Sequence, residues 1–253
     1  MKNTSVIKKL KEQSPIVHNI TNYVVMNNTA NALLAIGASP IMAHAPQEME
    51  DMVSISSSLV INMGTLSEKW VEAMVLAIKK AKETGTPCVF DPVGVGASKY
   101  RMETAKRIIE AATPEVIRGN ASEIMALAQV TGSSKGVDST MDSQDAIEAA
   151  KSLSKELNNT VVISGAVDYI ITQDKVSEVE GGSPMMTRVT GMGCTSTSIV
   201  GACIAVEEDR HQAAVAAMEL MSEAGSRTAA IAKGPGSFQM NFLDSLYQIL
   251  QEA

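Results

Sequence analysis

Short apolar runs alternate with longer amphipathic segments along the whole chain. The runs, bounded by Gly, Pro or Asn, predict strands over 15–18, 40–43, 58–64, 87–92, 116–117, 159–165, 169–172 and 175–179. The longer segments predict helices over 23–36, 67–82, 100–112, 121–129, 142–157, 194–206, 211–233 and 237–250. The last two strands, joined through Gln173 and Asp174, have the pattern of an antiparallel hairpin. Repeated strand–helix alternation predicts a doubly wound α/β fold, with a mostly parallel sheet and helices on both faces.

The composition supports one folded domain. Of the 253 residues, 45% are hydrophobic and 19% are charged, which is enough apolar material for a sizeable core. Only 3% are aromatic, so the core must consist of aliphatic residues and many of the 16 methionines. No low-complexity linker or break in composition divides the chain, and we therefore expect a single domain over 1–253.

Charge and cysteine content exclude several classes of function. The net charge is −7 without a basic cluster, which argues against a nucleic-acid partner. Cys88, Cys194 and Cys203 lack paired spacing, so neither a disulfide framework nor a zinc site is expected. The charged N-terminal segment does not have the pattern of a signal peptide, and no run reaches the roughly 18 apolar residues of a membrane span. These features predict a cytoplasmic protein with no membrane partner.

Polar residues and glycines gather where the predicted strands end. In doubly wound sheets, ligands bind beyond the carboxyl ends of the strands. The sequence places the following groups there: His18-Asn19, Met42, Asn62-Met63-Gly64, Asp91-Pro92, Arg118-Gly119-Asn120 and Ser164-Gly165. We expect them to meet at one edge of the sheet.

A glycine-containing segment, Thr190-Gly-Met-Gly-Cys194, precedes an apolar helix. Glycines let a backbone approach a ligand closely, and a helix start offers free N–H groups to an anion. An ordinary capping loop would use the same residue types. The glycine pair, together with the small residues that follow it, favours phosphate binding. A Walker A motif and a dinucleotide-binding glycine motif after a first strand are both missing from the sequence.

The position of Asp91 makes it a candidate metal ligand, and Glu123 stands in a pattern typical of a helix start. Asp91 ends a predicted strand, and such a carboxylate can hold Mg²⁺, although Asp-Pro is also ordinary strand-to-loop punctuation. Asn120 and Glu123 lie one helical turn apart on the same face, which also suits a helix cap. Such a cap would fix the carboxylate of Glu123 in place.

Five strings together resemble the hydroxyethylthiazole kinase family, a branch of the ribokinase-like kinases. They are His18-Asn-Ile-Thr-Asn22, Asp91-Pro-Val-Gly-Val-Gly96, Arg118-Gly-Asn-Ala-Ser-Glu123, Val189-Thr-Gly-Met-Gly-Cys194 and Lys233-Gly-Pro-Gly-Ser-Phe238. They occur in order over nearly the whole chain. The resemblance implies a ribokinase-like fold and ATP- and Mg²⁺-dependent phosphorylation of the primary alcohol of 4-methyl-5-(2-hydroxyethyl)thiazole, giving thiazole phosphate for thiamine biosynthesis or salvage. It also implies a homo-oligomer, a trimer with sites at subunit interfaces.

The same resemblance implies roles for individual residues. Gly191, Gly193 and Cys194 would be catalytic; Arg118, Ser164 and Asn120 would bind ATP; Met42, Gly191 and Asn22 would bind the acceptor; Asp91 and Glu123 would hold Mg²⁺. Cys194 stands where most ribokinase-like enzymes have an Asp base. A thiol at a helix start can have a pKa lowered from about 8.5, which would make it a weak base. Alternatively, Cys194 only shapes the anion site.

Three other functions compete with this interpretation. One is a ribokinase-like kinase acting on a hydroxymethylpyrimidine, pyridoxal or a sugar. Another is a nucleotide-dependent repair dehydratase, which would call for an Asp in place of Cys194. The third is a silent module that binds the thiazole or a nucleotide without turnover.

Overall fold

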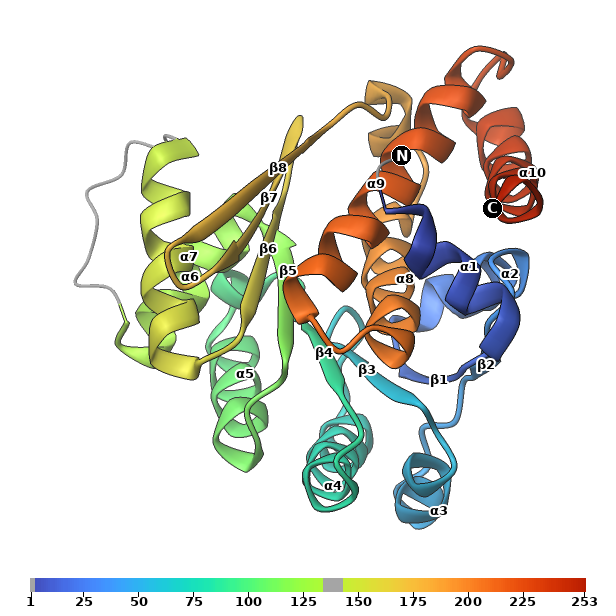
Figure 1. Ribbon diagram of the computed structural model, residues 1–253. Helices are drawn as coiled ribbons and strands as arrows, with labels where there is room; N and C mark the ends of the chain where they lie inside the picture. The colour runs from blue at the N-terminus through green and yellow to red at the C-terminus, as the bar shows by residue number, and fades with distance from the viewer. Residues whose placement is uncertain (1–2, 134–142) are drawn as a thin grey trace.

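The computed structural model describes residues 3–133 and 143–253, and a single eight-stranded sheet runs through this part of the chain (Figure 1). The strands are β1 (Ile16–Ile20), β2 (Ser39–Ile41), β3 (Ser58–Asn62), β4 (Cys88–Asp91), β5 (Val116–Asn120), β6 (Thr160–Ser164), β7 (Val167–Thr172) and β8 (Lys175–Glu180). Their order in the sheet is β2-β1-β3-β4-β5-β6-β7-β8. The strands from β2 to β6 pair in parallel, whereas β7 pairs antiparallel with both β6 and β8. The predicted mostly parallel sheet and its terminal hairpin are confirmed.

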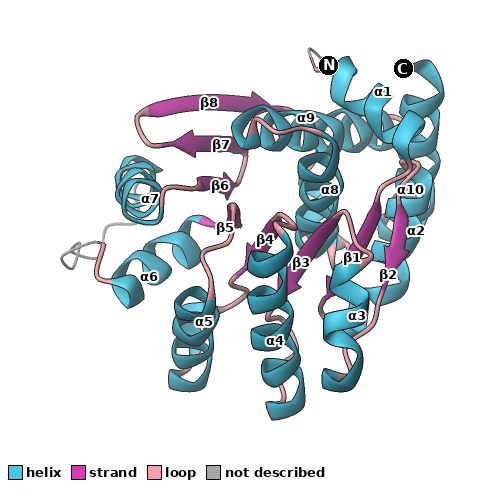
Figure 2. Ribbon diagram, turned by 60° about the horizontal axis from the view of Figure 1, so that its bottom comes forward, coloured by secondary structure: helices cyan, strands magenta, loops and turns pink. Residues whose placement is uncertain are grey.

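Helices cover both faces of the sheet (Figure 2). One face packs against α3 (Met49–Ser54), α4 (Glu68–Thr84), α5 (Lys99–Ala111), α6 (Ala121–Thr131) and α7 (Ser143–Leu157). The other packs against α1 (Thr4–Gln13), α2 (Met26–Ala35), α8 (Met192–Val206), α9 (Arg210–Ala229) and α10 (Pro235–Glu252). Two hydrophobic cores result, one on each side of the sheet, as a doubly wound fold requires.

Helix α8 is the central element of the second layer. It packs on β1, β3 and β4, and most of its residues from Cys194 onward are buried. A Cβ at Gly201 would overlap Val60 of β3, so this glycine allows the helix to lie directly on the sheet. Because the two elements are in contact, the N-terminus of α8 is fixed relative to the strand ends.

Two helices were not predicted from the sequence, namely α1 and α3. Helix α1 contributes Val6, Ile7 and Leu10 to the core. Their spacing places them on one face of a helix, but the charged residues around them made this pattern hard to recognise in the sequence. The predicted helix over 142–157 begins with a residue outside the described ranges, and α7 accounts for 143–157.

The strand at 116–117 was predicted too short. Strand β5 extends through Asn120, because it pairs with β6 from Val116↔Thr160 to Asn120↔Ser164. Arg118 and Asn120 therefore lie within the strand rather than after it. His18 and Asn19 are likewise inside β1. Of the described helices, none combines the length and the apolar character that crossing a membrane demands.

Candidate active site

Two glycines form the start of α8. Gly191 caps the helix with φ = +83°, and a Cβ there would overlap Val25. At Gly193 a Cβ would lie 2.9 Å from Nη1 of Arg118. The N–H groups of a first helical turn have no partner within the helix, so they are free to bind an anion. Both positions need glycine to keep this surface open.

Arg118 of β5 is the cation beside that helix start. Its side chain is nearly buried, and the residue is 8% exposed. Nη2 donates a hydrogen bond of 2.6 Å to Oγ of Ser164, and Nη1 lies 3.9 Å from Oδ2 of Asp91. Nε has no hydrogen-bond partner among the described residues. A buried guanidinium next to free helix N–H groups is suited to binding a phosphate.

Asp91, at the end of β4, is fully enclosed. Its Oδ2 accepts hydrogen bonds from Nδ2 of Asn62 at 2.8 Å and from Oγ1 of Thr197 at 2.7 Å. Burial raises the pKa of Asp91 to about 6, with a smaller contribution in the same direction from Glu123, while Arg118 opposes the shift. Oδ1 is buried and has no partner in the described part of the chain. One carboxylate oxygen is therefore available for a cation.

Asn120 and Glu123 form the predicted capping box at the start of α6, and this prediction is confirmed. Oδ1 of Asn120 accepts from the N–H of Glu123, and Oε2 of Glu123 accepts from the N–H of Asn120, both at 2.9 Å. Oε1 of Glu123 also accepts from the N–H of Gly94 at 2.8 Å. The carboxylate of Glu123 is thus held by two backbone groups, close enough to Asp91 to raise its pKa.

The side chain of Cys194 meets Asn22, which follows β1. Nδ2 of Asn22 donates to Sγ at 3.7 Å, and Oγ1 of Thr65 donates to Oδ1 of Asn22 at 2.7 Å. Burial raises the pKa of Cys194 to about 11, and the Asp91 carboxylate acts in the same direction. The sequence-based expectation of a lowered pKa at this helix start is therefore wrong, because burial and the Asp91 carboxylate outweigh the hydrogen bonds from Asn62 and Asn22 and the charge of Arg118.

Met42 lies directly after β2, partly buried against the α8 side of the sheet. The backbone around it is held by two histidines. His18 contacts the carbonyl of Ala43 through Nε2 at 2.9 Å, and Nδ1 of His44 contacts the carbonyl of Met42 at 3.3 Å. The ring of His44 packs 4.7 Å from that of Trp70, and Tyr23 lies 6.2 Å from Trp70 on the segment that carries Asn22. Aromatic rings therefore link the Met42 and Asn22 segments.

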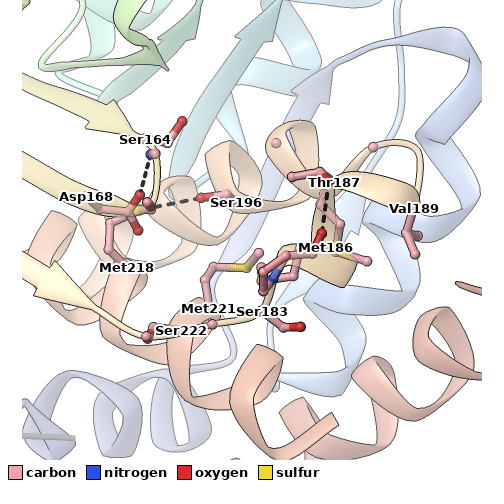
Figure 3. A pocket seen from close by; sticks show the side chains of 18 of the residues that line it. Ser164, Asp168, Ser183, Met186, Thr187, Val189, Ser196, Met218, Met221 and Ser222 are labelled. Carbon is pink, nitrogen blue, oxygen red and sulfur yellow. Dashed lines mark hydrogen bonds between the residues drawn. The ribbon is translucent and has the colours of Figure 1, made fainter. Parts of the chain in front are cut away.

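A cavity of about 840 Å³ opens on one side of the α8 N-terminus (Figure 3). Four predicted site residues line it: Arg118, Ser164, Gly191 and Gly193. The remaining predicted site residues, Asn22, Met42, Asp91, Asn120, Glu123 and Cys194, do not line it. Asn22 and Cys194 are in contact with each other, and Asp91 lies beside Arg118.

Sequence reasoning missed most of the cavity wall. Asp168 of β7, the Gly181-Gly182 pair after β8, and Met218 and Met221 of α9 all line it. Gly181 and Gly182 have φ values of +119° and +77°, and such a pair directly after a strand was the available signal. The two methionines have no comparable local signal, since the chain brings them here from a helix that follows α8.

The fold and the site together indicate a class of protein, the ribokinase-like proteins. The chain has the fold of a ribokinase-like superfamily protein from Enterococcus faecalis, with a TM-score of 0.72 at 12% identity, covering 99% of this chain and 94% of that one. The family model described as the hydroxyethylthiazole kinase family matches residues 7–252. The chain belongs to this family.

Individual relatives agree with that assignment. A hydroxyethylthiazole kinase of Leptospira biflexa is 52% identical over 250 residues, which cover 98% of this chain and 94% of that protein. The solved structure of the hydroxyethylthiazole kinase protein from Pyrococcus horikoshii OT3 has a TM-score of 0.91 at 40% identity and covers 98% and 94% of the two chains. The range 7–252 that the family model matches contains the residues that line the cavity and every predicted site residue.

Proposed function

We propose that the protein, as a single kinase domain, transfers the γ-phosphate of ATP to the primary alcohol of 4-methyl-5-(2-hydroxyethyl)thiazole. The thiazole phosphate formed would serve thiamine biosynthesis or salvage. The observation that carries the proposal is the position of the α8 N-terminus. Gly191 and Gly193 at this helix start line a nucleotide-sized cavity, and Cys194 of the same turn contacts Asn22, which does not line the cavity. A phosphate held at this helix start would therefore lie close both to the cavity and to the residues proposed for the acceptor, as a transfer between two substrates requires.

On the donor side, Arg118 and Ser164 would bind the phosphates of ATP, and Asn120 would lie next to them at the end of β5. The N–H groups of Gly191 to Cys194 would stabilise charge that builds up on the transferring group. Fixed donors of this kind need no rearrangement during the reaction, which is why they contribute strongly to catalysis.

On the acceptor side, Asn22, Met42 and Gly191 would hold the alcohol. The amide of Asn22 can bond the hydroxyl or the ring nitrogen, and the thioether of Met42 can pack on a sulfur heterocycle. Cys194 keeps its proton at neutral pH, because its pKa is about 11. We therefore assign the thiol to orienting the hydroxyl. A loose transition state needs little activation of the nucleophile.

The acidic pair fits a magnesium ion. Oδ1 of Asp91 lacks a hydrogen bond within the described residues, and the nearby Glu123 raises the pKa of Asp91. Mg²⁺ prefers one or two carboxylates together with water and phosphate oxygens, and it needs no larger cluster of acidic residues. Asp91 and Glu123 would hold the ion, which when bound neutralises phosphate charge.

The test is a coupled assay with ATP, Mg²⁺ and the thiazole alcohol. The purified protein is expected to release ADP and thiazole phosphate in equal amounts, and chelation of divalent metal is expected to stop the reaction. A panel containing pyridoxal, a hydroxymethylpyrimidine and ribose should give far lower kcat/KM. A folded protein that binds ATP without releasing ADP would contradict the proposal and select a silent binding module.

Replacing Cys194 by alanine separates the two roles of the thiol. If Cys194 only orients the hydroxyl, kcat/KM is expected to fall by about tenfold, whereas loss of a general base costs on the order of 10²–10⁴-fold. The pH profile between 6 and 9 should keep its shape, because the wild-type thiol does not ionise there. Cys203→Ala, which removes a second buried thiol from the same helix, is the matched control and should keep kcat/KM near that of the wild type.

We further propose that the protein is a cytoplasmic homotrimer with its acceptor sites at subunit interfaces. Tyr23 and Val24, which follow Asn22 directly, are 65% and 68% exposed, and a neighbouring subunit would cover them. Light scattering coupled to gel filtration should give three times the 26.7 kDa mass of the chain. A monomer with full activity would contradict a shared site.

A further inference from the structure

A polar row crosses the edge of the sheet along one wall of the cavity. Arg118, Ser164 and Asp168 come from three neighbouring strands, β5, β6 and β7, and all three line the cavity. The pairing of Ile163 with Tyr169 brings Ser164, at the end of β6, next to Asp168, near the start of β7, as Figure 3 shows. The phosphate-binding pair, Arg118 and Ser164, is therefore continued by a carboxylate.

One of the two carboxylate oxygens of Asp168 accepts a hydrogen bond that orients the group. Oδ1 accepts a hydrogen bond of 2.9 Å from the N–H of Gly165, and the charge of Arg118 acts on the carboxylate, but Oδ2 has no hydrogen bond within the part of the chain that the structure describes. The bond orients the carboxylate through the short turn between β6 and β7. Because Asp168 lines the cavity and is partly buried, Oδ2 can be satisfied by a bound ligand.

The negative charge of Asp168 determines which part of a nucleotide can lie against it. A carboxylate repels phosphate oxygens, so the group that faces Oδ2 must be a hydrogen-bond donor or a cation. Asp168 is the one acidic side chain among the described residues that line the cavity. A cation would prefer Asp91 and Glu123, where two carboxylates are close together. The hydroxyl groups of the sugar and the amino group of the base remain as the donors.

The order of groups along the cavity favours the sugar hydroxyls. Phosphates belong at Arg118 and the α8 N-terminus. Met218 and Met221 from α9, together with Met186 beside that helix, offer thioether surface of the kind that packs on a planar base. In a nucleoside triphosphate the ribose joins these two parts, and Asp168 lies next to the phosphate-binding residues.

We propose that Asp168 binds the ribose hydroxyls of the donor nucleotide and so determines the preference for ribonucleotides over deoxyribonucleotides. This inference rests on the proposed ATP site.

The experiment compares the wild type with Asp168→Ala and Asp168→Asn. For each, kcat/KM is measured with ATP, 2′-deoxy-ATP and 3′-deoxy-ATP, and binding of ADP and its deoxy analogues is measured by calorimetry without turnover. The wild type should prefer ATP over at least one analogue by about tenfold or more, since a hydrogen bond to a charged group is lost. Asp168→Ala should remove this preference, and Asp168→Asn should weaken it. KM for the thiazole alcohol should not change.

Asp174→Asn is the matched control. It makes the same chemical change at the tip of the same hairpin, where Asp174 is exposed and paired with Lys155 at 2.6 Å. This variant should keep the preference for ATP.

Equal discrimination in the wild type and the Asp168 variants would overturn the inference, as would a wild type that does not distinguish ATP from either analogue. A raised Mg²⁺ requirement with unchanged discrimination would also overturn it, and would assign Asp168 to a cation. If Asp168→Ala does not fold, Asp168→Asn and the ADP binding data decide. A wild type that binds neither ATP nor ADP would contradict the proposed function itself.

Discussion

Changing Gly193 to alanine is expected to lower kcat/KM by about 10³-fold while leaving Tm nearly unchanged. The new Cβ would lie 2.9 Å from Nη1 of Arg118, so the guanidinium must move away from the phosphate site. The same methyl group would stand in front of the first-turn N–H groups. Gly193 has ordinary helical backbone angles, and alanine favours a helix over glycine by up to about 1 kcal/mol, which offsets the strain of moving Arg118.

The control for this change is Gly236→Ala. Both glycines are the second residue of a helix, but a Cβ at Gly236 would meet no atom within 4 Å. Its kcat/KM should equal that of the wild type. Gly191→Ala should differ from both, with lower activity and a lower Tm, because the residue has φ = +83° and its Cβ would overlap Val25. Activity of Gly193→Ala within tenfold of the wild type would mean that the transferring phosphate docks elsewhere.

The sheet and most helices could be predicted because their signals are local. Apolar runs between turn residues mark the strands, and the fold follows from their alternation with helices. Helix α1 was missed because Val6, Ile7 and Leu10 form only one short apolar face among lysines. Strand β5 was predicted too short because Arg118, Gly119 and Asn120 are poor strand formers. Pairing with β6 makes these residues a strand, and such pairing is not visible in a local pattern.

The candidate site likewise combines local motifs, which could be predicted, with residues that only the fold brings together. The glycines at the start of α8 and the Asn120–Glu123 cap are local motifs, and the structure has both. Asp168 and Met221 line the same cavity although 53 positions separate them in the numbering, so only the fold brings them together. The pKa of Cys194 was expected to fall, and it rises because α8 is buried between sheet and helices. Burial of this kind depends on the whole layer rather than on neighbours in sequence.

Burial of the charged Asp91 carboxylate lowers the stability of the folded protein. Removing this charge is therefore expected to raise stability and to lower activity. Asp91→Asn is expected to lower kcat/KM by at least about 10²-fold, because the proposed Mg²⁺ site loses a charged ligand. The same change should raise the free energy of unfolding at pH 7.5 by up to about 3 kcal/mol, since the folded-state pKa of Asp91 is raised from 3.8 to about 6. Chemical denaturation in the presence of a chelator measures the gain.

The pH dependence of that gain identifies its cause. A carboxyl group whose pKa is higher in the folded state binds its proton more tightly when folded. The wild type therefore bears the full cost of the charge above pH 6 and loses that cost as the pH falls toward 4. The difference between Asp91→Asn and wild type should shrink over this interval. Taking the difference also cancels the contributions of His18 and His211, whose pKa values are lowered by burial.

Asp209→Asn is the control, and its expected change in stability has the opposite sign. Asp209 caps α9, and its hydrogen bond from the N–H of Gln212 lowers its pKa, so its charge stabilises the folded state above pH 4. This variant should be less stable than the wild type at pH 7.5 and equally active. If Asp91→Asn were also less stable across the whole range, the hydrogen bonds from Asn62 and Thr197 together with Arg118 would outweigh burial. The carboxylate would then be a structural group, and a metal ion would not be needed to explain its position.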